Sequence, residues 1–286
     1  MILNEKYALS NGVAIPKIGL GTWFIKDNEV AQAVKEAVRI GYRHIDTAQA
    51  YQNERGVGEG VRSCGIAREE LFVTTKLAAE VKSYQEAVAS IDASLKALGL
   101  EYIDLMIIHS PKPWAKFRDS DRYFEGNRAA WRALEDAYKA GKIRSIGLSN
   151  FEREDIDNIL GSCSVRPMVN QILAHISNTP MDLIQYNRDN NILVEAYSPF
   201  GHGELFKNKE VAAIAGKYAV SVAQLAIRYC LELGLVPLPK TANPIHMEAN
   251  AQVSFTINDD DMNLLKNVRQ IKDYGDHSIF PVYAKK

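Results

Sequence analysis

Short apolar runs alternate with longer amphipathic stretches along almost the whole sequence, and this alternation is the feature that most constrains the fold. Eight apolar runs with strand character occur, at 18–21, 43–45, 71–75, 103–108, 143–148, 167–171, 192–196 and 235–238. The stretches between them have helical length and spacing, at about 29–40, 54–64, 83–98, 126–140, 153–160, 180–189 and 220–233. Because strands separated by helices pair in parallel, eight such units favour a closed α/β fold, the (β/α)8 TIM barrel, over an open sheet.

The repeat is continuous, and no linker rich in Pro, Gly or Ser divides it, so we expect a single barrel domain over residues 1–286. Ahead of the first barrel strand, 7–15 alternates around Asn11-Gly12, which predicts an N-terminal β-hairpin. Two stretches are longer than ordinary connections, the segment 111–125 and the tail 274–286. We expect the first to be a long loop over the active-site face. The tail either folds over that face as well or packs on the side of the barrel.

The net charge, the apolar runs and the cysteines indicate which kinds of partner and site to expect. The formal net charge is -1, which gives no electrostatic reason to expect nucleic acid or an anionic membrane, so we expect a small-molecule substrate. The first residues lack a continuous apolar segment and no later run reaches the length of a membrane span, so we expect a cytoplasmic protein, acting as a monomer. Cys64, Cys163 and Cys230 are odd in number and far apart, which favours buried thiols over disulfides or a zinc site.

Three successive apolar runs end in ionisable residues. Asp46 follows 43–45, Lys76 follows 71–75, and His109 follows 103–108. Neighbouring parallel strands lie roughly 5 Å apart, so Asp46 and Lys76 can pair side by side, with His109 one strand further on. Active sites of α/β barrels lie at the carboxyl ends of the strands. The pattern therefore predicts a site at this end of the barrel, to which Tyr51 can add a hydroxyl group.

These residue types suit proton transfer to a carbonyl oxygen. A tyrosine hydroxyl has an ordinary pKa of about 10 and transfers its proton poorly at neutral pH unless a cation stabilises the phenolate. Lys76 could supply that charge, Asp46 could hold the ammonium group, and His109 could donate a hydrogen bond to a substrate oxygen. Taken singly, each residue has an ordinary structural explanation, and their convergence favours catalysis. Because none of these side chains can supply a hydride, a nicotinamide or similar cofactor is required.

An ordered series of motifs covers nearly the whole chain and resembles the aldo-keto reductases. The motifs are Ile-Gly-Leu-Gly-Thr-Trp (18–23), Gly-Tyr-Arg-His-Ile-Asp-Thr-Ala (41–48), Tyr51 with Asn53-Glu54, Ser-Leu-Lys-Ala-Leu-Gly-Leu-Glu-Tyr-Ile-Asp-Leu (94–105), Ile-Gly-Leu-Ser-Asn-Phe (146–151), Val-Asn-Gln (169–171), Ala-Tyr-Ser-Pro (196–199) and Pro239-Lys240. The resemblance is to members of the 2,5-diketogluconate reductase and aldehyde reductase type. It implies NAD(P)H-dependent reduction of aldehydes and ketones, with Tyr51 as general acid, Lys76 and Asp46 tuning it, and His109 orienting the carbonyl group.

The same resemblance implies a cofactor site. Ser149, Asn150 and Gln171 would bind the nicotinamide carboxamide, and Tyr197 would stack on its ring. The full implied set is Thr22, Ser149, Asn150, Gln171, Tyr197, Ser198, Pro199, Phe200, Lys240, Thr241, Ala242, His246 and Asn250. The family does not use the Gly-x-Gly-x-x-Gly phosphate turn, so its absence is no objection. Gly56, Gly58 and Gly60, two residues apart, are expected to serve helix packing instead.

One departure from the family pattern concerns the cofactor phosphate. Where the family has Lys-Ser-x-x-x-x-Arg-x-x-Glu-Asn, residues 240–250 place His246 at the Arg position and Ala249 at the Glu position. Arginine offers a permanent charge and a fork of donors, whereas a histidine is mostly neutral at pH 7. We therefore expect NADPH to be bound with reduced preference and NADH also to be used. The alternative is that Lys240 and Thr241 suffice for strict NADPH preference.

A second departure concerns the substrate pocket, for which we expect Trp23, Ser110 and Trp114. Ser110 stands where the family often has Trp after the catalytic His, and Leu173-Ala174-His175 replaces the usual Glu-Tyr-His. Loss of a large ring widens the pocket unless Trp114 or Phe117 fills the space, while Trp23 provides an aromatic wall. Without an Arg clamp, such a pocket favours aldehydes or ketones of moderate size over small dicarboxylates.

Three other functions remain open at this point. A metal-dependent barrel hydrolase could use His44, Asp46, His109 and His175, but a lysine beside Asp46 would compete with the cation, and no His-x-His motif is present, so we expect no metal. A non-catalytic, nicotinamide-binding subunit of a larger assembly is the second. The third is a Schiff-base aldolase acting through Lys76.

Overall fold

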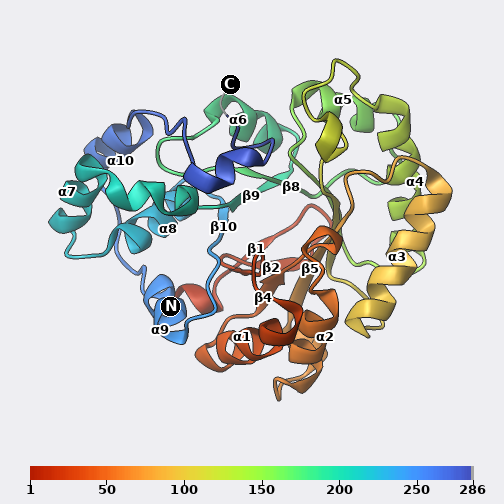
Figure 1. Cartoon of the computed structure of the whole chain (residues 1–286), viewed down its shortest axis with the longest axis horizontal. Coiled ribbons are helices and arrows are strands. Elements are labelled where there is room, and N and C mark those ends of the chain that lie inside the picture. Colours follow the sequence, from red (N-terminus) through yellow and green to blue (C-terminus); the bar gives the residue numbers. More distant parts are fainter. Residues whose placement is uncertain (285–286) are drawn as a thin grey trace.

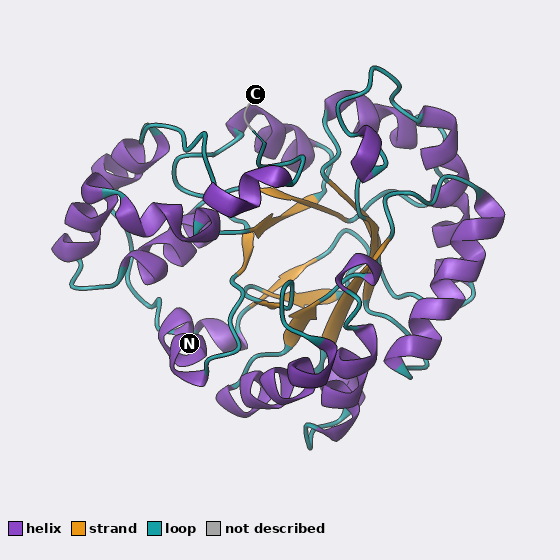
Figure 2. Cartoon of the chain, in the orientation of Figure 1, coloured by secondary structure: helices purple, strands orange, loops and turns teal. Residues whose placement is uncertain are grey.

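The computed structural model of the chain describes residues 1–284 and has an eight-stranded parallel barrel at its centre (Figures 1 and 2). The strands follow one another around the barrel in sequence order, as β3 (Leu20–Gly21), β4 (His44–Asp46), β5 (Phe72–Leu77), β6 (Leu105–Ile108), β7 (Ile146–Ser149), β8 (Val169–Leu173), β9 (Leu193–Tyr197) and β10 (Val236–Leu238). Gly21 N donates to Pro239 O at 3.0 Å and Gly21 bridges Lys240, which joins the two edge strands. The predicted (β/α)8 barrel is confirmed.

Helices surround the barrel on its outer face (Figure 2). They are α1 (Asp27–Ile40), α2 (Glu54–Ser63), α3 (Tyr84–Leu98), α4 (Phe124–Lys139), α5 (Arg153–Leu160), α6 (Met181–Asp189), α7 (Lys209–Lys217), α8 (Val222–Glu232), α9 (Pro244–Ala251) and α10 (Asp259–Lys266). Seven of them match the predicted helices to within about two residues at each end, as expected for sequence-based boundaries. No single helix of residues 1–284 is long and apolar enough to cross a membrane, although α7 and α8, bent by 81° at their junction, pass that test together.

The strands differ from the prediction at two of the ionisable residues. β4 includes Asp46 as its last residue. β5 continues to Leu77, so Lys76 belongs to the strand and does not follow its end. The whole of β5 is buried, and Lys76 is only 1% exposed. A parallel strand that is covered on both faces normally carries apolar residues, so a buried lysine at this position requires compensation by its neighbours.

The predicted N-terminal hairpin is present and lies at the end of the barrel opposite the pocket described below. It pairs β1 (Lys6–Ala8) with β2 (Ala14–Pro16), and Tyr7 faces Ile15. Asn11 Nδ2 donates to Arg144 O at 3.0 Å, and Arg144 lies just before β7 begins. The hairpin therefore covers the end at which the strands start.

The closely spaced glycines of α2 pack against helices on both sides, as predicted. A Cβ atom at Gly56 would overlap the carbonyl oxygen of Asp27 in α1, and one at Gly58 would overlap that of Leu98 in α3. Gly60 approaches Val34 in the same way. These positions let three helices come together, and they do not form a phosphate cradle.

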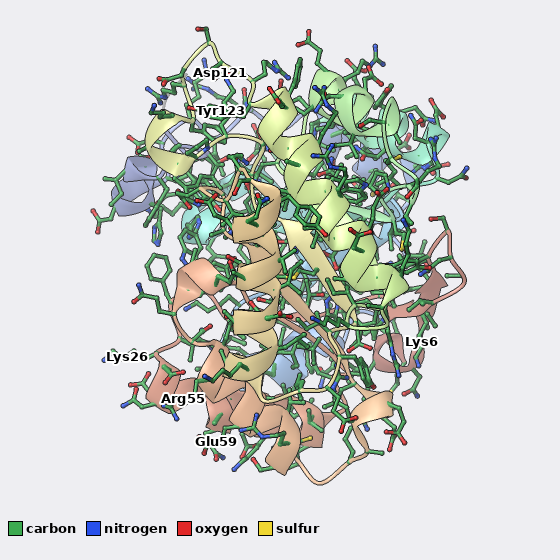
Figure 3. All side chains as sticks on the ribbon, turned by 90° about the vertical axis from the view of Figure 1, so that its right-hand side faces the viewer. Lys6, Lys26, Arg55, Glu59, Asp121 and Tyr123 are labelled. Atoms are coloured by element: carbon green, nitrogen blue, oxygen red, sulfur yellow. The ribbon has the colours of Figure 1, made fainter. Side chains whose placement is uncertain are left out.

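The loop and the tail both reach the carboxyl ends of the strands. Lys82 Nζ donates to Ser110 O at 3.0 Å and to Asn127 Oδ1 at 2.8 Å, which anchors the beginning and end of the loop 111–125. Figure 3 shows this loop, with Asp121 and Tyr123, at the opposite end of the molecule from Arg55 and Glu59 of α2. The tail folds over the same end, where Tyr283 and Ser198 share a hydrogen bond of 2.8 Å. Residues 285–286 of the predicted tail lie outside the described part.

Sequence reasoning missed several elements after β9. These are the 3-10 turns at Gly201–Lys207 and the helices α7, α9 and α10. Each of the three helices is eight or nine residues long and begins after an asparagine that caps it, namely Asn208, Asn243 and Asn258. Such short helices depend on tertiary packing and caps more than on periodicity. The cysteines also differ from expectation, because Cys230 is buried while Cys64 and Cys163 are half-buried; all three are free.

Candidate active site

A pocket of about 660 Å³ opens at the carboxyl ends of the barrel strands. Most of the predicted site residues line it: Thr22, Trp23, Asp46, Tyr51, His109, Trp114, Ser149, Asn150, Gln171, Tyr197, Ser198, Pro199, Phe200 and Lys240. Lys76 lies behind this lining and reaches it through Asp46 and Tyr51. The pocket therefore brings the proposed catalytic residues together with most of the proposed cofactor residues.

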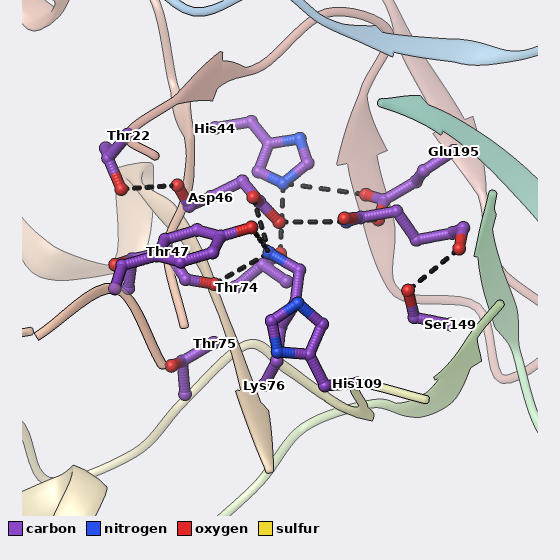
Figure 4. A network of polar contacts seen from close by, with 12 residues as sticks. Thr22, His44, Asp46, Thr47, Thr74, Thr75, Lys76, His109, Ser149 and Glu195 are labelled. Carbon is purple, nitrogen blue, oxygen red and sulfur yellow. Dashed lines mark hydrogen bonds and ion pairs between the residues drawn. The ribbon is translucent and has the colours of Figure 1, made fainter. Parts of the chain in front are cut away.

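The ammonium group of Lys76 is the centre of the polar contacts (Figure 4). Lys76 Nζ donates to Asp46 Oδ1 at 2.6 Å, to Thr47 O at 2.8 Å and to Tyr51 OH at 3.3 Å. Three donors and three acceptors leave no unpaired ammonium hydrogen. The neighbouring strands β4 and β5 place Asp46 and Lys76 next to each other, as their spacing in the sequence indicates.

Tyr51 keeps its proton in this environment. Burial, followed by the charge of Asp46, raises the pKa of Tyr51 well above its ordinary value. Desolvation of the buried phenolate is the larger effect and opposes the acidifying influence expected of Lys76. Lys76 instead stands 3.3 Å from the oxygen on which negative charge develops when the proton leaves. Tyr51 is thus a retained proton donor beside a fixed cation.

His109 is present as the neutral imidazole. Burial, followed by the charge of Lys76, lowers its pKa well below the ordinary value. Its ring stands edge-on to Tyr51, with 5.7 Å between ring centroids, and its Nδ1 atom is buried without a hydrogen-bond partner among the described residues. A neutral imidazole has one N–H group to donate. Because His109 lines the pocket, a ligand there can accept a hydrogen bond from the ring.

The predicted carboxamide-binding residues are held by one another. Ser149 Oγ donates to Gln171 O at 2.9 Å, and Tyr197 OH donates to Asn150 Oδ1 at 2.7 Å. Asn150 Nδ2 donates to His109 O at 3.0 Å. The backbone of Asn150 is in the left-handed region, with φ of 61°. Asparagine tolerates this region better than most residues. The four strands β6 to β9 therefore present one connected row of polar groups along the pocket.

A buried network below the pocket was missed by sequence reasoning. Gln171 Nε2 donates to Asp46 Oδ2 and to Glu195 Oε2, both at 2.8 Å. Glu195 is fully buried, and His44 Nε2 lies 3.6 Å from its Oε1 atom. Burial, followed by the charge of Asp46, raises the pKa of Glu195 to about 8. Burial lowers the pKa of His44 to about 3. The sequence signal was a carboxylate in the middle of an apolar run, Leu193-Val194-Glu195-Ala196.

The pocket wall corrects one predicted residue. Ser110 is fully buried and does not line the pocket; its carbonyl oxygen accepts from Lys82, and its hydroxyl accepts from Lys112 N. Trp114 from the long loop stands edge-on to His109 instead, with centroids 5.1 Å apart. The space left by Ser110 is therefore filled by a ring from the loop, which was one of the two outcomes expected from the sequence.

Further lining comes from two segments that the sequence did not single out and from the tail 274–286, whose position the sequence left open. They are Phe24, the stretch His202, Gly203 and Phe206 after β9, and the tail residues His277, Phe280, Pro281, Val282 and Tyr283. Trp23 is the common neighbour, with ring centroids 5.0 Å from Phe280 and 5.5 Å from His202. The aromatic residues of the tail could be recognised in the sequence. Which side of the barrel they cover could not be predicted from it.

The residues at the other end of the pocket fit an anionic group. Lys240 lines the pocket and is exposed, and α9 begins four residues later, where Asn243 Oδ1 accepts from Ile245 N at 3.0 Å. A lysine close to the positive end of a helix dipole suits a phosphate, although Pro244 has no N–H group and Ile245 N already donates to Asn243. Thr241, Ala242, His246 and Asn250 do not line the pocket; His246 is exposed on α9, whereas Asn250 is buried. A nicotinamide cofactor therefore fits the pocket from the polar row to Lys240.

The hydrolase and aldolase alternatives find no support in this geometry. Within residues 1–284, no group of three or more His, Cys, Asp or Glu side chains is arranged to hold a metal ion. His175, one of the four candidate ligands, instead contacts Tyr274 OH through Nε2 at 3.1 Å. Lys76 donates to three oxygen atoms, so its nitrogen has no free lone pair with which to form a Schiff base.

Comparison with known proteins gives a consistent result. The profile described as "Aldo/keto reductase family" matches residues 17–270. The chain is 40% identical to the glyoxal reductase of Bacillus subtilis over 275 residues, which cover 96% of each sequence. The crystal structure of an aldo/keto reductase from Brucella melitensis superposes with a TM-score of 0.86 at 36% identity, covering 93% of this chain and 98% of that one. A Bombyx mori aldo-keto reductase in complex with NADP has a TM-score of 0.84 at 34% identity, covering 98% of each chain.

The raised pKa of Glu195 predicts a dependence of stability on pH. An unfolded glutamate ionises near pH 4.5, whereas the folded one keeps its proton up to about pH 8. Between these values the unfolded state releases a proton that the folded state retains, so the free energy of unfolding falls as pH rises. Glu195→Gln removes this loss, and its advantage over the wild type should grow with pH by up to about 1.4 kcal/mol per unit. Urea unfolding at several pH values between 5 and 8 measures it, and parallel curves for the two proteins would contradict the assignment.

Proposed function

The chain belongs to the aldo/keto reductase family and is an oxidoreductase that reduces carbonyl compounds with NAD(P)H, and we propose that Tyr51 donates the proton in this reaction. The observation that carries the proposal is the position of Lys76 Nζ, between the Asp46 carboxylate at 2.6 Å and the Tyr51 hydroxyl at 3.3 Å. General acids are recognised by a tuned ionisable group within reach of the reacting atom. Tyr51 lines the pocket, where a substrate carbonyl group can approach its hydroxyl.

The roles of the protein groups follow from their contacts. Tyr51 OH gives its proton to the oxygen of the substrate carbonyl, and the phenolate left behind lies beside the ammonium group of Lys76. Asp46 holds that ammonium group in place, and Thr47 O shares it. Neutral His109 donates one N–H group to the same substrate oxygen, which orients the carbonyl group. When bound, a reduced nicotinamide supplies the hydride that the side chains lack.

We propose that the cofactor lies along the row of polar groups between His109 and Lys240. Ser149, Asn150 and Gln171 would hold the carboxamide group, and Tyr197 would lie against the nicotinamide ring. Ser198, Pro199 and Phe200, which line the pocket beyond Tyr197, would cover the diphosphate, together with Thr22, which follows β3. Lys240, Thr241, Ala242, His246 and Asn250 are proposed for the adenosine end. A structurally similar reductase from Bombyx mori was crystallised in complex with NADP, which supports a nicotinamide cofactor for this pocket.

For the substrate, the pocket favours a neutral carbonyl compound of moderate size. Its outer part is lined by aromatic side chains, Trp23, Phe24, Trp114 and Phe280, and the described lining includes no arginine that could clamp a carboxylate. Aromatic walls favour apolar or flat groups through contact area. The similarity to a glyoxal reductase makes small dicarbonyl compounds a reasonable first set of test substrates.

Tyr51→Phe tests the assignment of the acid. The substitution removes one oxygen atom and leaves the ring that packs against Trp23, with centroids 6.1 Å apart. We expect the rate of NADPH oxidation with an aldehyde to fall by about 10²-fold or more, while NADPH binds nearly as in the wild type. The decrease in absorbance at 340 nm measures the rate, and quenching of protein fluorescence measures binding. A large loss of binding would show that the assigned role is wrong.

His246→Arg tests the proposal that NADH is used beside NADPH. Histidine gives the 2′-phosphate no permanent charge, so we expect the wild type to accept both cofactors. An arginine at this exposed position should lower the KM for NADPH by about tenfold and leave that for NADH nearly unchanged. Steady-state rates with each cofactor are the measurement. Equal changes in both KM values would remove His246 from the phosphate site.

A further inference from the structure

We propose that Glu195 is a positioning residue for the cofactor: its carboxyl group helps to fix the Gln171 amide, so that Gln171 presents its carbonyl oxygen to the amino group of the nicotinamide carboxamide. This inference rests on the proposed function in one respect, since it assigns the nicotinamide to the row of polar groups that includes Gln171. It adds a residue that does not line the pocket and that acts through another side chain.

The two amide hydrogens of Gln171 are both donated to carboxyl groups of the protein. Nε2 lies 2.8 Å from Asp46 Oδ2 and 2.8 Å from Glu195 Oε2. These two acceptors come from β4 and β9, on either side of the barrel interior, and β8 carries Gln171 between them. An amide nitrogen has two hydrogens, so both are used. Because the Asp46 carboxylate can only accept, the amide cannot be turned around without placing two oxygen atoms against each other.

Because both hydrogens of the Gln171 amide are used, its carbonyl oxygen Oε1 is the atom left to contact a ligand. No described residue donates a hydrogen bond to Gln171 Oε1, and Gln171 lines the pocket. The group that Gln171 offers to a ligand is therefore an acceptor and not a donor. A carboxamide ligand can meet it with its N–H groups, whereas a carboxylate ligand at the same place would be repelled.

The charge state of Glu195 follows from the groups around it. Asp46 faces it across Gln171, Lys76 is the nearest fixed cation and is bound to Asp46, and His44 Nε2 lies 3.6 Å from Glu195 Oε1. One lysine cannot neutralise two buried carboxylates, and a buried unpaired charge is costly. The pKa of Glu195 is raised to about 8 and that of His44 is lowered to about 3, which leaves both groups neutral at pH 7. The uncharged carboxyl group accepts from Gln171 without weakening the bond between Asp46 and Lys76.

Binding of two ligands to three variants tests the proposal. The ligands are NADPH and 2′,5′-ADP, which lacks the nicotinamide. Glu195→Met keeps the length of the side chain but removes one of the two acceptors, so Gln171 is held by Asp46 alone and one of its amide hydrogens loses its partner. We expect NADPH to bind about tenfold more weakly and 2′,5′-ADP to bind as in the wild type. Glu195→Gln restores a neutral acceptor and should bind NADPH within about twofold of the wild type. Dissociation constants from titration calorimetry measure both ligands.

Glu135→Met is the matched control. Glu135 is 5% exposed, and its Oε1 accepts from Ser164 N at 2.6 Å and Val165 N at 2.7 Å, on the outer face of the barrel. Its loss should lower stability without changing either dissociation constant. The proposal is overturned if Glu195→Met binds NADPH as the wild type does. It is equally overturned if Glu135→Met weakens NADPH as much, or if 2′,5′-ADP is weakened together with NADPH.

A second measurement needs only the wild type, in case Glu195→Met does not fold. NADP⁺ and its analogue with nicotinic acid in place of nicotinamide differ in the group that meets Gln171. We expect the carboxylate analogue to bind at least about tenfold more weakly, and equal affinities would overturn the proposed orientation of Gln171. Failure of the proposed function would appear differently, as wild-type protein that binds NADPH but oxidises it with no aldehyde, ketone or dicarbonyl compound.

Discussion

The buried ion pair between Lys76 and Asp46 is the interaction on which the rest of the site depends. Lys76 is 1% exposed, and an ammonium group so far from water is tolerated only when its hydrogens are all accepted. Asp46, Thr47 and Tyr51 supply the three acceptors, and each comes from β4 or the turn that follows it. The need to compensate one buried cation thus brings the proposed proton donor to the bottom of the pocket and keeps it there.

The same requirement extends through Asp46 to the far side of the barrel. Asp46 uses one oxygen for Lys76 and the other for Gln171, and Gln171 in turn reaches Glu195. The proton-transfer group and the nicotinamide-facing amide are therefore two ends of one hydrogen-bonded chain, built on strands that are remote in sequence. A change at either end alters the partner of a buried charge, which is why the proposed catalytic and cofactor residues are coupled in this fold.

Much of this arrangement could be predicted from the sequence, for identifiable reasons. The strand–helix alternation predicts the barrel, and the spacing of Asp46, Lys76 and His109 at successive strand ends predicts that they meet. What the pattern could not predict depends on tertiary contacts. The turns and α7 after β9 are short, the direction of the tail is set by contacts such as that of Tyr283 with Ser198, and the place of Trp114 is set by how Lys82 anchors its loop. The sequence shows Glu195 as an ionisable residue within an apolar strand, but it does not show that Gln171 on β8 is its partner.

The central claim is that Lys76 assists proton transfer by Tyr51, and the single-turnover rate of NADPH oxidation by Lys76→Met tests it most directly. Methionine fills the space but carries no charge. The ring of Tyr51 keeps its contacts with Trp23 and His109, while its hydroxyl loses the cation beside it. The account predicts that the rate at pH 7 falls by about 10²-fold or more, while NADPH still binds with nearly wild-type affinity. A variant that oxidises bound NADPH at the wild-type rate would contradict it.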